Sequence, residues 1–395
     1  YGETQMPMGY HANSDLEKDS PGSANEPRDD SGLWKYFVSV QEEMRVLEIG
    51  ARHNSQIHNL FVADIDCTQI DTSHTHLQES QRRYSATTAV NKLKTYSIDQ
   101  IPDRFGSKRQ FDVVLIDVPS TERQELFLRQ GQDAYQGILN YCQKILKPDG
   151  ILVVFASNKY SFSNLQLRHI LFTNDSSRKT HLKQLEKAGF FKTQCYTPRV
   201  SGNHVEGYFG LNTSALNDTP LPLSPPKDWK QALRESYLTS SYLFLSRASD
   251  LPPKDTLLNM VVSDISTHLH EKFGQGRLDI LNSFITRKRK LVLEATWQNR
   301  QVIVKIPQCD MALRSETNNF SVLNAISNQI GEDNTPTPLA KGIVTKQRYF
   351  VESLLPGVGL SLIANGVNRD YFLPGIFDLL KNFYVLVIDR PGWGQ

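Results

Sequence analysis

Features that would tie this chain to a membrane, a polyanion or an oxidising compartment are scarce or missing. No uninterrupted apolar run approaches the ~20 residues that cross a bilayer, and the polar N-terminus lacks the apolar segment of a signal peptide. The 44 basic and 42 acidic residues nearly balance, so no excess of one sign would attract nucleic acid. These absences predict a soluble, cytoplasmic protein with no transmembrane segment and no nucleic-acid partner.

Cysteine is also sparse, and its spacing is uninformative for metals. The four cysteines form no CxxC pair and lie far apart, at Cys67, Cys142, Cys195 and Cys309. A zinc site or a disulfide framework needs clustered or regularly spaced cysteines. We therefore expect reduced thiols and no metal site.

The composition does support globular cores. Hydrophobic residues make up 39% of the chain, and 395 residues exceed the ~250–300 at which single cores usually stop growing, so two domains are expected. Residues 1–31 are rich in Ser, Pro, Asn, Asp and Glu, which predicts a disordered tail. The chain opens on Tyr1 and closes just after an apolar run, from which we expect a fragment of a longer protein.

Short apolar runs alternate with helical patterns from residue 32 to residue 248. Such alternation predicts an α/β domain, with a doubly wound, mostly parallel sheet that binds ligands at the carboxyl ends of its strands. Residues 249–274 are then expected to form a linker and a helix, followed by a β-rich unit over residues 275–395. The expected strands of the first unit are 44–49, 67–70, 93–98, 111–116, 151–156, 192–196 and 241–246, and its expected helices are 55–63, 76–86, 134–146 and 177–188.

Glycine and acidic residues fall at successive strand ends of the first unit. Gly50 follows a buried-type strand, where the backbone has to approach a ligand without a Cβ in the way. About twenty residues further on, Asp71 ends the second strand, at the distance where an acidic side chain accepts ribose hydroxyls. Asp99 and Asp117 follow the third and fourth strands. The alternative for Asp71 and Asp99 is a helix cap or a turn residue.

The order and spacing of these residues resemble class I S-adenosylmethionine-dependent methyltransferases. The motifs that carry the resemblance are Leu47-Glu48-Ile49-Gly50, Asp71, the run from Phe111 to Asp117, and the run from Leu146 to Val154. The resemblance implies binding of S-adenosyl-L-methionine, with cofactor contacts at the first motif (Glu48, Gly50), Asp71, Asp99 and Asp117. Arg52 and Asn54 stand where the family usually has further glycines, which leaves open whether Arg52 blocks the loop.

The residues 158–161 and 185–190 also resemble methyltransferases of surface-glycan pathways, which implies a small-molecule or glycan acceptor. No general base for such a transfer stands out. Four histidines, which can titrate near neutrality, are the available candidates: His53, His58, His169 and His181. A lone histidine is more often a surface or core residue, so the catalytic residue stays unknown.

The second unit resembles the small lobe of aminoglycoside-phosphotransferase-like kinases. Lys305 lies on a β-branched strand where a charge needs a partner, and Glu316 follows on an expected helix. The resemblance implies that Lys305 and Glu316 hold ATP, with Glu352 at the hinge. Alternatively, Lys305 extends its stem to water and Glu316 is an exposed helix residue. No His-Gly-Asp catalytic loop follows before Gln395, so this lobe is expected to be truncated and inactive as a kinase.

Together these patterns favour a bifunctional protein that methylates a small molecule or a glycan and carries an incomplete kinase-like lobe, as in polysaccharide biosynthesis. Two other functions stay open. The chain could be a non-catalytic scaffold with degenerate methyltransferase and kinase folds, or another nucleotide-binding α/β enzyme. A nicotinamide enzyme would be favoured by a GxGxxG after the first strand, and that motif is missing.

Overall fold

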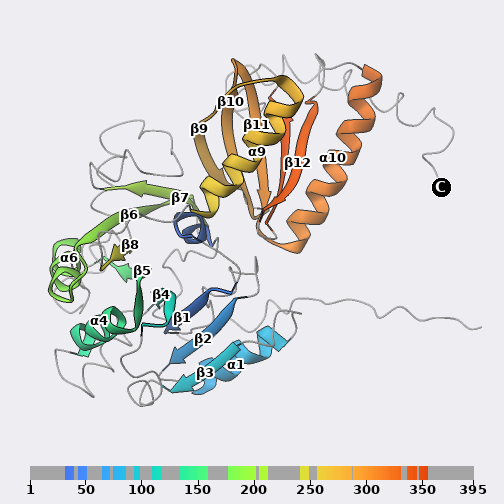
Figure 1. Ribbon diagram of the computed structural model, residues 1–395. Helices are drawn as coiled ribbons and strands as arrows, with labels where there is room; N and C mark the ends of the chain where they lie inside the picture. Colours follow the sequence, from blue (N-terminus) through green and yellow to red (C-terminus); the bar gives the residue numbers. More distant parts are fainter. Residues whose placement is uncertain are drawn as a thin grey trace, which may run out of the picture.

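In the computed structural model, the described residues form an eight-stranded and a five-stranded β-sheet, which lie in separate parts of the ribbon (Figure 1). It describes residues 32–39, 43–50, 65–71, 74–85, 93–97, 109–117, 134–158, 177–201, 204–211, 241–248, 256–286, 288–330, 336–344 and 347–354. The expected 1–31 tail and the expected helix at 55–63 lie outside these residues. None of the helices in the described part of the chain combines the length and hydropathy that a membrane span requires.

The eight-stranded sheet has the order β3-β2-β1-β4-β5-β8-β6-β7. Strands β1, β2, β3, β4 and β5 pair in parallel, whereas β8 pairs antiparallel with both β5 and β6, and β7 pairs antiparallel with β6. The prediction of a mostly parallel sheet is therefore confirmed. The strands are β1 (Arg45–Ile49), β2 (Asp66–Asp71), β3 (Leu93–Ser97), β4 (Phe111–Asp117), β5 (Leu146–Ser157), β6 (Lys192–Ser201), β7 (His204–Gly210) and β8 (Ser241–Arg247).

Both faces of this sheet are covered, as expected for parallel strands with helical connections. Along β4, Val114 and Ile116 pack into one core with helices α4 (Ala134–Ile145) and α6 (Arg178–Lys187). Val113 and Leu115 point to the opposite face, into a second core. Helix α1 (His74–Ser85) follows β2. The alternation along one strand thus divides the unit into two apolar layers.

Strand β5 departs from the sequence expectation. The run from Lys147 to Gly150 predicts a turn, but the structure includes it in β5 as an irregularity, because the register jumps from Phe111–Leu146 to Val113–Ile151. The Lys147 ammonium donates to both Asp112 carboxylate oxygens, at 2.8 and 2.7 Å. A Cβ on Gly150 would stand 3.0 Å from the Asp112 carbonyl oxygen. The glycine is needed for this close approach.

The five-stranded sheet is antiparallel and has the order β12-β13-β11-β10-β9. Its strands are β9 (Leu278–Ile285), β10 (Lys290–Trp297), β11 (Arg300–Pro307), β12 (Pro338–Val344) and β13 (Gln347–Ser353). Helix α10 (Asp310–Ile330) follows β11, and helix α9 (Leu257–Phe273) precedes β9. The Tyr349 hydroxyl fixes α9 to the sheet, because it lies 2.7 Å from Asp264 Oδ2 and 2.9 Å from His268 Nδ1.

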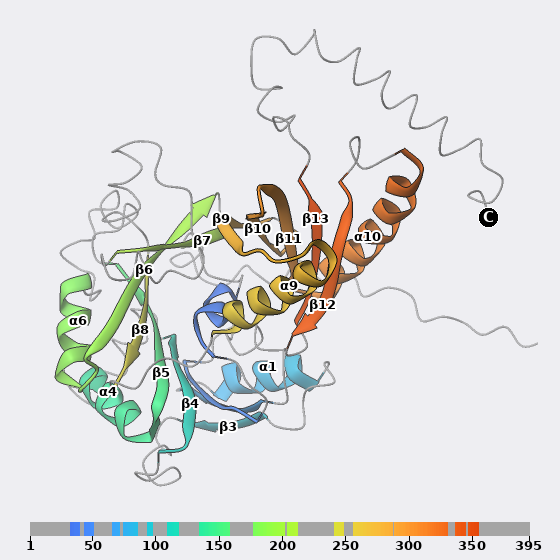
Figure 2. The same ribbon diagram turned by 45° about the horizontal axis from the view of Figure 1, so that its top comes forward.

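The 3-10 helix η1 (Leu33–Phe37) lies beside the start of α9, between the two sheets (Figure 2). Its Phe37 ring packs 4.9 Å from Tyr196 and 5.8 Å from Tyr208, centroid to centroid, on the first sheet. In the other direction, Lys35 Nζ donates to Gln347 Oε1 at 3.3 Å. Its Tyr36 hydroxyl accepts from Gln308 Nε2 at 2.7 Å.

A single apolar core therefore runs through both sheets. It joins Val113 and Leu245 of the first sheet to η1, to Ile265 of α9 and to Leu293 and Val304 of the second sheet. The last strand of the first sheet ends at Arg247, and the first strand of the second sheet begins at Leu278. The domain boundaries at residues 248 and 275 remain predictions, because this core extends across them.

Candidate functional site

Three of the expected site residues lie side by side at the carboxyl edge of the first sheet. Ile49 is in register with Ile70 on one side and with Ile116 on the other. The next residue of each strand is therefore Gly50, Asp71 and Asp117. Strand β1 lies between β2 and β4, and the order reverses there, which is the point at which doubly wound sheets bind ligands.

Gly50 has the backbone conformation that the first site needs. Its φ is +92°, and its N–H donates to the Ile70 carbonyl at 2.8 Å. L-residues rarely adopt such a φ, so a side chain here would strain the turn. Gly50 is itself buried, and because it has no Cβ a ligand could approach the backbone closely at this strand end.

The acidic residues at this edge differ in their surroundings. Asp71 is buried, with 2% of its surface exposed, and Asp117 is half-buried. Glu48 points into the interior, where its Oε2 accepts from Gln69 Nε2 at 2.7 Å. Gln69 Oε1 accepts in turn from Ser80 of α1 at 2.7 Å. Glu48 therefore supports the strand end from within, whereas Asp71 and Asp117 lie at the edge itself.

Several other expected site residues lie outside the described part of the chain. These are Asp99, Arg52, Asn54, His53, His58 and His169. His181 is described, and it is buried between the rings of Tyr135 and Phe244, at 6.1 and 5.5 Å between centroids. It is a core residue of α6. Within the described ranges, no three His, Cys, Asp or Glu side chains gather as a metal site would require.

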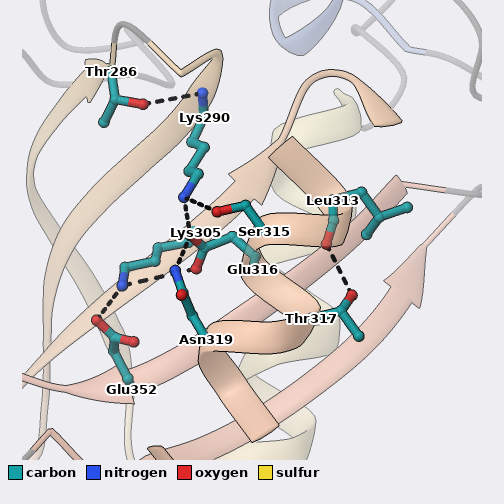
Figure 3. Close-up of polar contacts among 9 residues, drawn as sticks. All are labelled: Thr286, Lys290, Lys305, Leu313, Ser315, Glu316, Thr317, Asn319 and Glu352. Atoms are coloured by element: carbon teal, nitrogen blue, oxygen red, sulfur yellow. Dashed lines mark hydrogen bonds and ion pairs between the residues drawn. The ribbon is translucent and has the colours of Figure 1, made fainter. Parts of the chain in front are cut away.

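The second sheet carries a buried cluster of four charges beneath α10 (Figure 3). Lys305 Nζ lies 2.5 Å from Glu352 Oε1 and 3.8 Å from Glu316 Oε2. Only 3% of the Glu316 side chain is exposed. The structure therefore brings together Lys305, Glu316 and Glu352. Burial of the Glu316 carboxylate requires compensating cations.

Lys290 is the second cation of this cluster, and the sequence analysis did not identify it. It binds Glu316 Oε1 and lies 3.5 Å from Ser315 Oγ, while Asn319 Nδ2 donates to the same Glu316 oxygen at 3.2 Å. The register of the β10–β11 hairpin could have identified Lys290. Gln298 and Asn299 both have positive φ, as a two-residue turn requires, and this turn pairs Val292 with Lys305. Lys290, two residues before Val292, then shares a face with Lys305.

Glu352 reaches the same cluster from β13. It is in register with Ile303, two residues before Lys305, so its side chain lies on the face that Lys290 and Lys305 share. The expected hinge residue is therefore held by the strand lysine. The two glutamates and the two lysines of the buried cluster neutralise one another.

A comparison with protein-family models found no match, and a comparison with curated proteins found none either. Among solved structures, the chain is similar to a methyltransferase from Archaeoglobus fulgidus described as SAM-dependent, at 14% identity and TM-score 0.38 over 55% of this chain and 92% of that one. It is similar to the CurJ carbon methyltransferase at 14% identity and TM-score 0.34, over 53% of this chain. The match spans 49% of the CurJ chain.

A third similar structure is phosphoethanolamine N-methyltransferase 2 of Haemonchus contortus, solved with S-adenosylhomocysteine. The identity is 13% and the TM-score 0.36, over 56% of this chain and 52% of that one. At these TM-scores the function of the present chain has to be argued from its own residues.

Proposed function

We propose that the first unit binds S-adenosyl-L-methionine and transfers its methyl group to a small-molecule or glycan acceptor. The observation that carries the proposal is the register that sets Gly50, Asp71 and Asp117 side by side at the switch point of the sheet. A neutral glycine turn beside carboxylates suits a nucleoside, whose ribose presents two hydroxyl donors. The same carboxylates would repel a phosphate-rich ligand.

Each of these residues would have a separate role in binding the cofactor. Gly50 would let the backbone approach the ligand, Asp71 would accept hydrogen bonds from the ribose hydroxyls, and Asp117 would border the ligand on the β4 side. The cofactor, when bound, supplies an activated methyl group on a sulfonium. Glu48 holds the end of β1 in place through Gln69. Positioning of the two reactants is the main contribution that such a site makes to the transfer.

Calorimetry with S-adenosylhomocysteine tests this proposal. The chain should bind the ligand, and Asp71→Asn should weaken binding by about tenfold or more, because a ribose donor loses its charged acceptor. Asp66→Asn is the matched control, since Asp66 lies on the same strand at the opposite edge and pairs with Arg45 at 3.7 Å. No heat at millimolar ligand would reject the proposal and favour a non-catalytic scaffold.

A second candidate function belongs to the second unit. We propose that Lys305 and Glu316 form a nucleotide-binding pair of the kinase type, in which a lysine on the third strand holds phosphates and pairs with a helix carboxylate. The 3.8 Å ion pair between β11 and α10 favours it over an unpaired strand lysine.

This candidate predicts nucleotide binding without turnover. The sequence contains no His-Gly-Asp catalytic loop after Glu352. Mg·ATP should therefore bind and stay intact, and Lys305→Met should abolish the binding while Lys341→Met, an exposed lysine of β12, should not. Robust ATP hydrolysis by the purified chain would contradict the expectation of binding without turnover.

A further inference from the structure

The buried cluster has an unequal arrangement of its two lysines. Glu316 Oε1 accepts from Lys290 and Asn319, whereas its Oε2 lies 3.8 Å from Lys305, beyond hydrogen-bond range. Lys305 is instead 2.5 Å from Glu352. The helix carboxylate is therefore held mainly by Lys290, and the strand lysine mainly by Glu352.

The two lysines also differ in how exposed their side chains are. The Lys305 side chain is 23% exposed, against 10% for Lys290. The backbone around Lys290 is also fixed, because its N–H donates to Thr286 Oγ1 at 3.3 Å and its carbonyl accepts from the Thr286 N–H at 2.9 Å. Lys305 is thus the member of the cluster that a ligand can reach.

We propose that Lys290 is a positioning residue of the candidate nucleotide site, which neutralises Glu316 so that Lys305 can exchange Glu352 for a phosphate oxygen. This inference rests on the nucleotide-binding function proposed above. With Lys290 present, an incoming phosphate displaces one carboxylate from Lys305, and Glu316 keeps its partner. Without Lys290, the Glu316 carboxylate draws Lys305 toward it, and phosphate binding leaves two buried carboxylates without a cation.

The test compares three variants of the full chain. Lys290→Met removes the positioning charge, and Lys288→Met removes an equal charge from an exposed position of the same turn. The double variant Lys290→Met/Glu316→Gln also removes the charge that Lys290 neutralises. Titration with Mg·ATP should show binding weakened about tenfold or more in Lys290→Met and unchanged in Lys288→Met. The double variant should recover most of the lost affinity.

A second measurement does not depend on nucleotide binding. An amine-acylating reagent modifies only the unprotonated lysine, so its rate at Lys305, followed by peptide mass spectrometry, reports how firmly carboxylates hold that ammonium. The rate should fall severalfold in Lys290→Met, when Glu316 turns to Lys305, and return in the double variant. The exposed Lys179 serves as the internal reference.

The two measurements separate the two ideas. If the wild type binds no Mg·ATP but the acylation rates follow this pattern, the nucleotide function fails and the role of Lys290 stands. Equal Lys305 rates in the wild type and Lys290→Met would overturn the role of Lys290, whatever the nucleotide does. If Lys290→Met does not fold, the charge-balanced double variant should fold, and its failure to do so would also count against the inference.

Discussion

Lys35 provides the most demanding prediction, because its ammonium is buried between the two sheets and no described residue supplies a counter-charge. The residue is 4% exposed, and its Nζ donates to the Gln347 amide oxygen at 3.3 Å and lies 5.2 Å from the centre of the Tyr36 ring. Among the described residues, no carboxylate lies within ion-pair distance of it. Burial lowers the pKa of Lys35 from 10.5 to about 7.

This shift sets the sign and the size of a pH effect. The folded state holds fewer protons than the unfolded state between pH 7 and 10.5, so the free energy of unfolding rises with pH across that window. The slope for one proton is ~1.4 kcal/mol per pH unit, which gives about 3 kcal/mol between pH 7 and pH 9.5. Below pH 7 the full cost of burying the charge is present and constant.

Lys35→Met keeps the aliphatic stem and removes the titrating group. We expect the variant to be stabilised relative to the wild type at pH 7 by about 1–3 kcal/mol, because a cost of about 4 kcal/mol for the buried charge is offset by about 1–3 kcal/mol for the Gln347 oxygen that loses its donor. The advantage should shrink steadily toward pH 10, because the wild-type lysine is then neutral in both states. Only the wild type should show the steep rise.

Urea unfolding followed by circular dichroism at pH 6.5, 8 and 9.5 measures these differences. Lys179→Met, at an exposed position of α6, is the control for a general change in net charge and should show no such pH dependence. A stability difference between Lys35→Met and the wild type that is the same at all three pH values would refute the reasoning. It would mean that the ammonium is hydrated or paired in solution.

Three further predictions concern the other contacts. Asp71→Ala should weaken S-adenosylhomocysteine binding by ~1–3 kcal/mol in calorimetry, and unchanged affinity would mean that another carboxylate holds the ribose. Tyr349→Phe should lower the free energy of unfolding by about 1–3 kcal/mol in urea, because Asp264 loses a 2.7 Å hydrogen bond; burial, followed by the nearby Asp264, raises the pKa of Tyr349, so the wild-type hydroxyl remains a donor. Phe37→Ala should cost ~3–5 kcal/mol by loss of packing on Tyr196 and Tyr208, and an unchanged midpoint would contradict the contact.

The first sheet was predictable because its central strands carry continuous apolar runs. The run of β4 and the run of β5 after Gly150 are buried on both sides, so their residue types alone indicate parallel strands. The signal failed at residues 147–150, where a proline and a glycine indicate a turn. The ion pair of Lys147 with Asp112 stabilises an irregular strand instead, and that contact joins residues far apart in sequence.

The second sheet shows a different limit. Strand β9 mixes exposed, half-buried and buried positions without regular alternation, so its sequence gives little period-2 signal. Helix η1 was missed as well, since all five of its residues are buried by elements from both sheets. Lys305 and Glu316 could be paired from their element types, whereas Lys290 required the exact hairpin register. That register depends on whether the turn has two residues or three.

The common apolar core has a practical consequence for anyone who wishes to study the halves separately. Cutting the gene between Arg247 and Leu278 would leave Leu245 and Val113 on one product and Leu293 and Val304 on the other, each stripped of its covering neighbours. Large uncovered apolar patches cause self-association, so either half expressed alone is expected to precipitate. The covalent order of the two units and their physical independence are separate properties, and a core that both sheets share argues against the second.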